Sequence, residues 1–416
     1  MQICIFEDEK AEQFNPLTYS RPVYELVCGI STLREKIERH LPGSKVTLHC
    51  RKYLEDTLKK EYSKNDVNKI SDKECLFING RIIFNKKIAD QLKKTNKEDN
   101  VILSGNDIIA AKISGKTLSS IKNNLPDTIN RDLFNKIPSK QVDIKLTEYI
   151  WDLIKHNPNE LINDAKFLAK KIKRYKIKIM SAGIQCVNRK NIFINNGVIL
   201  KPGVVLDATN GPVIIDKNAF IHPNVVIEGP VYIGENTIVK SGATLYDNVS
   251  IGRNCKVGGE IEDTIMLPFS NKQHLGFIGH AYIGSWVNLG ANTNCSDLKN
   301  NYGNINVKVN NKEINTNTKF LGTIIGDHSK TSINTMINTG TVIGFSCNIY
   351  GAGFPEKYIP SFTWDGCEFL KTYKLDKAVE TASIVFDRRN KTFNIADKKL
   401  FKKIFDKTKN ERKGYN

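Results

Sequence analysis

Histidine is the side chain best suited to proton transfer near neutral pH, and this chain has only seven histidines. His274 lies in a polar segment, residues 260–276, that breaks a regular pattern of aliphatic residues. His280 follows six residues later. His274 has two interpretations: a general base that removes a proton from a nucleophile, or a surface histidine that caps a turn. Its position in the break favours the general base, with His280 as the second candidate.

A second polar segment, residues 294–320, breaks the same pattern and contains Asn301-Tyr302. A repeat protein buries more apolar surface by continuing its repeat, so a long polar excursion usually marks a working face. We therefore expect these two interruptions to carry the binding and catalytic residues of the second half of the chain.

The elements that must position these residues are predicted by the aliphatic pattern itself. An aliphatic residue recurs at every sixth position, and Asn, Gly, Asp and Pro fill the turns between. This period differs from the value of about 3.6 for a helix and about two for a strand, but it suits a short strand followed by a turn. Stacked units of this kind bury one continuous column, so we expect a parallel β-helix. The consecutive members are Ile215, Ile221, Ile227, Ile233, Val239, Leu245, Ile251 and Val257.

The first half of the chain alternates between short apolar strands and helices, which predicts an α/β domain with a largely parallel sheet. The expected strands are residues 2–6, 45–48, 75–82 and 100–103. The expected helices are residues 31–40, 52–62, 144–155 and 165–173, and, after the repeat stops, 376–389 and 397–409. The predicted domains are residues 1–190 (α/β), 191–365 (β-helix) and 366–416 (a basic, helical tail).

Composition limits the class of protein. The 416 residues include 62 Lys and Arg against 44 Asp and Glu, but only 12 of the 62 are the arginine that phosphate and base contacts favour. We therefore expect no nucleic-acid partner. No apolar run approaches the roughly 20 residues of a membrane span, and the chain turns acidic too early for a signal peptide. Nine cysteines without a CxxC pair predict neither a zinc site nor disulfides, which indicates a cytoplasmic protein.

The residues around the interruptions resemble the acetyltransferase half of bifunctional UDP-N-acetylglucosamine pyrophosphorylase/glucosamine-1-phosphate N-acetyltransferases. That family carries its catalytic His in a His-Leu-x-x-x-Gly context, followed by an Asn-Val-Asn-Ile-Gly-Ala-Gly segment and an Asn-Tyr-Asp loop. The matching residues here are His274-Leu275 with Gly279, the segment 287–291, and Asn301-Tyr302. The resemblance implies a left-handed β-helix that assembles as a homotrimer.

The resemblance also implies a reaction, acetyl transfer from acetyl-CoA to an amino-sugar 1-phosphate such as glucosamine 1-phosphate. His274 would be the general base, and Ser332 and Asn334 would contact acetyl-CoA. The family's Arg and Lys that hold the sugar phosphate align near Thr244 and residues 262–263, which are not cationic, so the acceptor stays open. The implied substrate contacts are Lys272, Phe277 (where the family has Tyr), Asn288, Asn301 and Tyr302.

The loop at residues 14–23 resembles the opening of nucleotidyltransferases that act on sugar 1-phosphates, through its Pro-Leu-Thr segment and Arg21 beside Pro22. This resemblance implies a Rossmann-like domain that transfers uridylyl from UTP to form UDP-N-acetylglucosamine. Arg21 would hold a phosphate, and Asp8 and Asp107 would hold Mg²⁺.

Two parts of the ordinary nucleotidyltransferase site differ here. An acidic segment, residues 7–13, replaces the glycine-rich loop that wraps the triphosphate, and the family's Gly-Asp reads Gly80-Arg81. The domain is therefore either active or a degenerate unit that binds a sugar nucleotide or stabilises the oligomer. Over most of its length the chain resembles divergent bifunctional proteins known from Bacteroidetes.

Three hypotheses follow from the sequence. The first is acetylation of an amino-sugar 1-phosphate, with or without coupling to UTP. The second is acetylation of a different amino sugar or sugar nucleotide. The third is a non-catalytic trimeric scaffold or regulator that binds sugar nucleotides.

Overall fold

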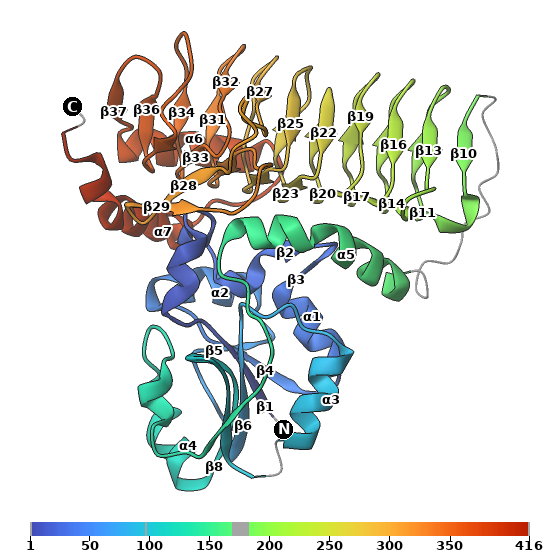
Figure 1. The fold of residues 1–416 in the computed structure, drawn as a ribbon. Coiled ribbons are helices and arrows are strands. Elements are labelled where there is room, and N and C mark those ends of the chain that lie inside the picture. The colour runs from blue at the N-terminus through green and yellow to red at the C-terminus, as the bar shows by residue number, and fades with distance from the viewer. Residues whose placement is uncertain (1, 96–97, 169–182, 415–416) are drawn as a thin grey trace.

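The computed structural model describes residues 2–95, 98–168 and 183–414, which form an α/β domain, a β-helix and a pair of C-terminal helices (Figure 1). This architecture confirms the fold predicted from the sequence. None of the helices in these ranges combines the length and apolar character that crossing a membrane requires.

The N-terminal domain is built on a seven-stranded sheet in the order β5-β4-β1-β6-β8-β7-β9. The four strands at one side run parallel, and β8 is antiparallel to both of its neighbours. All five residues of β1 are buried, as expected for a strand in the centre of a covered parallel sheet. The strands are β1 (Gln2–Phe6), β4 (Lys45–Leu48), β5 (Asp66–Val67), β6 (Glu74–Asn79), β7 (Asn100–Ser104), β8 (Asp107–Ser114) and β9 (Ser139–Gln141).

The other elements of this domain are a small hairpin and five helices. The last helix, α5, contains residues 150–155 of the expected helix 144–155 and residues 165–168 of the expected helix 165–173. Residues 169–173 lie outside the described part of the chain. These elements are β2 (Val27–Cys28), β3 (Ser31–Thr32), α1 (Leu33–His40), α2 (Glu55–Glu61), α3 (Lys86–Thr95), α4 (Gly115–Ile121) and α5 (Ile150–Leu168).

The β-helix consists of three faces, each a stack of short parallel strands (Figure 1). The first face contains β10 (Gln185–Val187), β13 (Val205–Asp207), β16 (Val226–Glu228), β19 (Thr244–Leu245), β22 (Glu260–Glu262) and β25 (Phe277–Gly279). The second contains β11 (Ile192–Ile194), β14 (Val213–Ile215), β17 (Val231–Ile233), β20 (Val249–Ile251), β23 (Ile265–Met266), β26 (Tyr282–Ile283), β30 (Ile324–Ile325), β33 (Val342–Ile343) and β35 (Tyr358–Ile359).

The third face contains β12 (Ile199–Leu200), β15 (Phe220–Ile221), β18 (Ile238–Val239), β21 (Lys256–Val257) and β24 (Asn271–Lys272). Further along the chain, one four-stranded sheet contains β31 (Lys330–Thr331), β34 (Asn348–Ile349), β36 (Thr363–Asp365) and β37 (Leu370–Thr372). A separate pair contains β27 (Asn294–Cys295) and β32 (Met336–Ile337). The sequence-based boundary at residue 190 lies just after β10, which already pairs with β13.

The six-residue period of the sequence explains the coil. Ile215 pairs with Ile233, and Ile233 pairs with Ile251, so one coil contains three hexapeptides. The turns depend on asparagine, which adopts a left-handed backbone more readily than other residues with a side chain. The turn asparagines with φ between +55° and +63° are Asn218, Asn224, Asn236, Asn248, Asn254, Asn292 and Asn334.

The two sequence interruptions have different structures. The expectation that residues 260–276 leave the coil is wrong, because β22, β23 and β24 all pair with the preceding coil. Lys272 pairs with Val257 and occupies the inward column with its side chain buried. The second interruption does leave the coil: between β26 and β30 it forms an antiparallel hairpin of β28 (Asn306–Val309) and β29 (Lys312–Asn315).

The α/β domain and the β-helix are joined by buried polar contacts. Tyr282 of the β-helix donates its hydroxyl to the carbonyl of Val27 at 2.9 Å and accepts the Val27 N–H at 2.8 Å. The Ser250 hydroxyl donates to the carbonyl of Gly29 at 2.7 Å. Helix α5 runs along this junction (Figure 1), and the amide of Asn157 donates to the carbonyl of Asn248 at 2.8 Å.

Helices α6 (Leu375–Asp387) and α7 (Ile395–Lys407) pack against the last coils of the β-helix through aromatic side chains. The His328 ring lies parallel to those of Trp286 and Phe386 and meets Phe401 edge-on, with ring centroids 4.9–6.1 Å apart. Its Nδ1 has no hydrogen-bond partner among the described residues. Burial, together with the nearby cations Lys330 and Arg21, lowers the pKa of His328 well below its usual value.

This burial predicts a pH-dependent stability that a His328→Phe variant should lack. Below about pH 6.5 the unfolded chain binds a proton at His328 that the folded chain does not, so the free energy of unfolding falls by about 1.4 kcal/mol per pH unit. The contribution is fully present above the pKa of the unfolded chain. Urea unfolding of both proteins between about pH 7.5 and about pH 5.5 would measure the difference, in which the other titrating groups cancel. Equal slopes would contradict this prediction.

Candidate functional site

His274 lies in the turn between β24 and β25, where its side chain is exposed. Within the described residues its imidazole has no hydrogen-bond partner, so both ring nitrogens face solvent. Lys272 fixes this turn, because its Nζ donates to the carbonyls of Gly258 and His274, both at 2.9 Å. Burial lowers the pKa of Lys272 to about 8. The amino group predicted to contact substrate is therefore engaged inside the coil.

The turn that carries His274 stacks on the same corner of the next coils. Gly276, with φ of +111°, lies so close to the carbonyl of Thr293 that a Cβ would be 2.2 Å from that oxygen. In the following coil the N–H of Asn334 donates to the carbonyl of Ala291 at 2.8 Å. The structure therefore brings His274 to the corner that also carries Ser332 and Asn334.

Polar side chains beside this corner are already hydrogen-bonded. Asn288 accepts a hydrogen bond from the amide of Asn271 at 3.2 Å, and Asn271 accepts one from Arg389 of the C-terminal segment at 2.9 Å. The backbone N–H of half-buried Phe277 donates to Asn294 at 2.9 Å. These contacts hold the predicted substrate residues Asn288 and Phe277 in place.

Asn301 and Tyr302 lie in an exposed loop that precedes β28. Tyr302 has 64% of its surface exposed and a φ of +55°. The Asn301 side chain accepts a hydrogen bond from the N–H of Gly303 at 3.0 Å. Among the described residues no hydrogen bond joins this pair to His274, so its predicted contact with substrate stays a prediction.

His280 lies at a different corner, among carboxylates. Its Nδ1 is 2.8 Å from Asp297 and its Nε2 is 3.7 Å from Asp263, and Phe320 stacks on the ring at 5.1 Å. Burial acts to lower the pKa of His280, but the bond to Asp297 and the nearby carboxylates outweigh it, so the pKa is raised. A raised pKa favours the protonated form of His280, which suits a counter-ion to the carboxylates more than a general base.

The same corner holds Asp247 and Glu262, whose oxygens lie within 4.8 Å of one another and of Asp263. Burial and mutual repulsion raise the pKa of Glu262 and of Asp263. Glu262 and Asp263 are the residues that align with a cation of the resembling family. Sequence reasoning missed Asp297, although its spacing of 17 residues from His280 is close to one coil.

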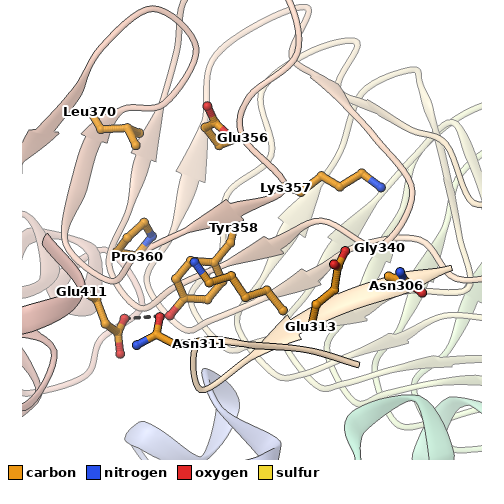
Figure 2. A pocket seen from close by; sticks show the side chains of 11 residues that line it. Asn306, Asn311, Glu313, Gly340, Glu356, Lys357, Tyr358, Pro360, Leu370 and Glu411 are labelled. Carbon is orange, nitrogen blue, oxygen red and sulfur yellow. Dashed lines mark hydrogen bonds between the residues drawn. The ribbon is translucent and has the colours of Figure 1, made fainter. Parts of the chain in front are cut away.

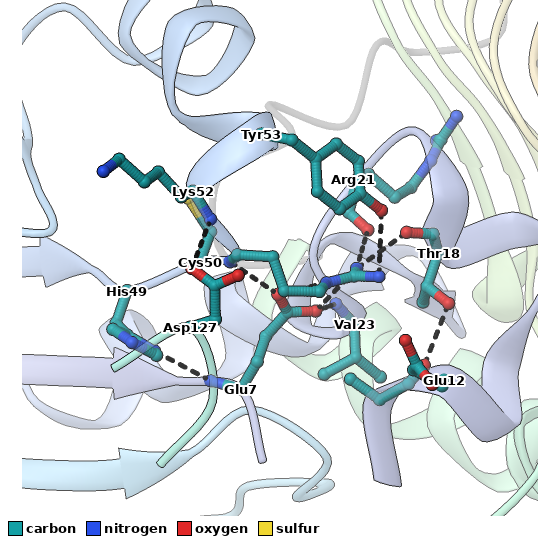
Figure 3. A network of polar contacts seen from close by, with 12 residues as sticks. Glu7, Glu12, Thr18, Arg21, Val23, His49, Cys50, Lys52, Tyr53 and Asp127 are labelled. Carbon is teal, nitrogen blue, oxygen red and sulfur yellow. Dashed lines mark hydrogen bonds and ion pairs between the residues drawn. The ribbon is translucent and has the colours of Figure 1, made fainter. Parts of the chain in front are cut away.

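In the N-terminal domain, charged residues follow the parallel strands. Glu7, directly after β1, is fully buried and accepts hydrogen bonds from Nε and Nη2 of Arg51, both at 3.1 Å (Figure 3). Arg51 follows the adjacent β4 and also donates to the carbonyls of Thr18 and Arg21 at 2.7 and 3.2 Å. This buried ion pair therefore fastens the 14–23 loop to the sheet.

The predicted phosphate ligand Arg21 faces the β-helix. Its guanidinium forms an ion pair with Asp327 and lies 3.4 Å from the hydroxyl of Ser285. Asp327 also accepts a hydrogen bond from Ser20 at 2.7 Å. Arg21 does not line the hollow that lies beside Asp8 and Asp107 and is described next.

Asp8 and Asp107, the predicted metal ligands, do come together, around a cation of the chain itself. Asp8 accepts from Nε and Nη2 of Arg81 at 2.6–3.1 Å, and Asp107 lies 3.3 Å from Nη2 of the same residue. Lys10 holds Asp107 through contacts of 2.8 and 2.9 Å. A hollow of about 230 Å³ adjoins this group.

Two larger hollows lie near the C-terminal helices. One, of about 530 Å³, is bordered by the β28–β29 hairpin, where Tyr358 donates to Glu411 at 2.8 Å and Lys308 lies 4.9 Å above the Tyr358 ring (Figure 2). The other, of about 640 Å³, lies between Arg51 and Tyr53 of the N-terminal domain and Lys403 of α7. Neither is lined by a residue predicted from the sequence to bind substrate.

Comparison with known proteins agrees with these two domains. Residues 3–173 match the family described as sugar nucleotidyl transferase, and residues 212–247 match bacterial transferase hexapeptide (six repeats). A bifunctional protein GlmU of Methanococcus maripaludis is 28% identical over 389 residues, which covers 82% of this chain and 91% of the relative. A bifunctional sugar-1-phosphate nucleotidylyltransferase/acetyltransferase of Sulfurisphaera tokodaii is 35% identical over 142 residues, 34% of this chain and 35% of the relative.

Among solved structures, the N-acyltransferase AntD from Bacillus cereus, in complex with dTDP and coenzyme A, is 15% identical with a TM-score of 0.20. The match covers 51% of this chain and 97% of AntD. An Arabidopsis UDP-N-acetylglucosamine acyltransferase is 14% identical with the same TM-score, over 56% of this chain and 90% of that protein. These TM-scores are too low to add to the fold derived above.

The chain is therefore a transferase that joins a sugar nucleotidyl transferase domain to a hexapeptide-repeat domain. Over most of its length the chain is similar to bifunctional GlmU proteins.

Proposed function

We propose that the protein transfers the acetyl group of acetyl-CoA to the amine of an amino sugar, with His274 as general base. The observation that carries this proposal is the position of His274. Its side chain is exposed, no described residue hydrogen-bonds to its ring, and it lies in the same row of turns as Ser332 and Asn334. A general base must be accessible to the attacking group, and His274 meets that condition.

In the proposed reaction the amine nitrogen attacks the thioester carbonyl carbon of acetyl-CoA. His274 accepts the proton that the nitrogen loses, the carbon–sulfur bond breaks, and the CoA sulfur leaves and takes up a proton. A neutral imidazole has a free ring nitrogen lone pair that can accept this proton.

Glucosamine 1-phosphate is the acceptor that the sequence resemblance implies. One observation, however, favours an acceptor whose phosphate lies elsewhere or is absent. Asp263 and Asp297 contact His280, and Asp247 and Glu262 lie beside Asp263, so this corner holds four carboxyl groups and one imidazole. Such a corner repels phosphate. The position and the presence of a phosphate on the amino-sugar acceptor therefore stay open.

Product analysis would test this proposal. The full chain is incubated with acetyl-CoA and, in parallel, with glucosamine 1-phosphate, glucosamine or a UDP-linked amino sugar, and thiol release is followed together with the mass of the product. Release with any of the three supports the acetyl transfer and identifies the acceptor. No release with all three would favour the non-catalytic scaffold that binds sugar nucleotides.

A homotrimer is part of the proposal. Large apolar side chains are exposed at the corner that carries His274, where Leu275 is 73% exposed and Ile333 is 68% exposed. A second copy of the chain would bury them. The match of residues 3–173 to sugar nucleotidyl transferases supports a sugar nucleotide as a ligand of the N-terminal domain.

A further inference from the structure

The residues that would hold a divalent cation in the N-terminal domain already hold a guanidinium. Both oxygens of Asp8 accept hydrogen bonds from Arg81, and one of them also accepts from the amide of Asn79 at 2.8 Å. Both oxygens of Asp107 lie within 2.9 Å of the Lys10 ammonium. All four carboxylate oxygens therefore have donors from the chain.

Arg81 is locked in this position. Its side chain is fully buried, and its Nη1 donates to the carbonyl of Thr147 at 2.7 Å. Arg81 comes just after β6, the strand that pairs with β1, so the fold itself delivers the guanidinium to Asp8 at the carboxyl edge of the sheet. Moving it aside would leave a buried charge without a partner, which is costly.

The charges at this site are already balanced. Asp8 and Asp107 contribute two negative charges, and Arg81 and Lys10 contribute two positive charges. Mg²⁺ needs free oxygen ligands at about 2.0–2.1 Å and would add two further positive charges. The residues at this site therefore do not fit a divalent cation.

We propose that Arg81 takes the place of the divalent cation, and that the N-terminal domain does not catalyse metal-dependent nucleotidyl transfer. The guanidinium is a permanent part of the fold, whereas a catalytic metal would exchange. Uridylyl transfer that requires Mg²⁺ between Asp8 and Asp107 is excluded by this arrangement.

The loop that follows β1 supports the same inference, because its side chains contact the rest of the chain. Asn15 donates to Asn310 of the β28–β29 hairpin at 3.3 Å, and Tyr19 donates to Glu411 at 2.9 Å. Arg21 forms its ion pair with Asp327 of the β-helix. The segment thus docks the α/β domain on the β-helix and the C-terminal helices.

Mn²⁺ binding by the full chain tests the proposal. The Asp263→Asn variant serves as the background in every arm, because it removes one carboxylate from the cluster in the β-helix. The Asp263→Asn protein and the double variant Asp263→Asn with Asp107→Asn should bind Mn²⁺ equally weakly. The Asp263→Asn protein should also release no pyrophosphate when it is incubated with Mg²⁺, UTP and N-acetylglucosamine 1-phosphate. Mn²⁺ binding that Asp107→Asn removes, or Mg²⁺-dependent pyrophosphate release, would overturn the proposal.

A second arm uses Arg81→Ala, which removes the guanidinium from both oxygens of Asp8 and leaves only the hydrogen bond from Asn79. This variant should bind Mn²⁺ that its parent does not bind, and Mn²⁺ should raise its Tm more than that of the parent. A folded Arg81→Ala protein without this gain would contradict the assignment of Arg81 as the occupant. If the Arg81→Ala protein does not fold, the Asp107→Asn comparison and the pyrophosphate assay still test the proposal.

Discussion

Replacing His274 with alanine should lower kcat for acetyl transfer by roughly 10²–10⁴-fold. The imidazole is the proton acceptor in the proposed reaction, and its side chain makes no hydrogen bond with the described residues that folding would depend on. Stability should therefore change little, and the KM for acetyl-CoA should stay close to that of the wild type. Steady-state thiol release, with the acceptor found by product analysis, measures the effect.

Two other histidines provide the controls for this prediction. His222 lies in a regular turn of the same β-helix, where it packs on Phe220 with ring centroids 4.7 Å apart, so His222→Ala should keep the wild-type rate. His280→Ala removes the partner of Asp297. If His274→Ala kept the full rate and His280→Ala lost it, the general base would instead be His280 at the acidic corner.

Replacing Arg51 with methionine should lower the free energy of unfolding by about 3–5 kcal/mol. Glu7 has no solvent contact, and the variant leaves its carboxylate buried without the guanidinium that holds it. The loop carbonyls of Thr18 and Arg21 also lose a donor. Urea unfolding followed by circular dichroism measures the loss.

Lys45 of β4, the strand that Arg51 follows, provides a control. It pairs with Asp66 at 2.9 Å, but this pair lies at the surface, and surface pairs contribute little to stability. Lys45→Met should therefore remain close to the wild type. The double variant Glu7→Gln with Arg51→Met should recover part of the loss, because it removes the stranded charge. Equal effects of Arg51→Met and Lys45→Met would show that the buried pair does not stabilise the loop.

The regular part of the fold could be predicted from the sequence because its determinants are local. A six-residue aliphatic period and turn asparagines such as Asn218 specify the coil without knowledge of any distant contact. The prediction failed at residues 260–276, since a polar residue was assumed to end the inward column. Lys272 shows why this assumption fails: its long side chain stays inside by donating to the carbonyls of Gly258 and His274.

The candidate site was less accessible to sequence reasoning, because its determinants are far apart in the chain. The exposure of His274 and its shared corner with Ser332 follow from the coil spacing and could have been derived. The contact between Arg21 and Asp327 could not, because it depends on how the two domains dock. The sequence did reveal that Arg81 stands where an aspartate is expected, but not that its guanidinium would lie between Asp8 and Asp107.

The junction between the two domains has a consequence for the cooperativity of folding. One continuous hydrophobic cluster includes Ile5 of the central sheet, Tyr282 of the β-helix and Ile404 of α7, all of them buried. Because neither half can expose its part of this cluster without cost, the α/β domain, the β-helix and the C-terminal helices stabilise one another as a single cooperative unit. A truncated chain that ends before α6 would present this apolar surface to water, and we expect it to aggregate.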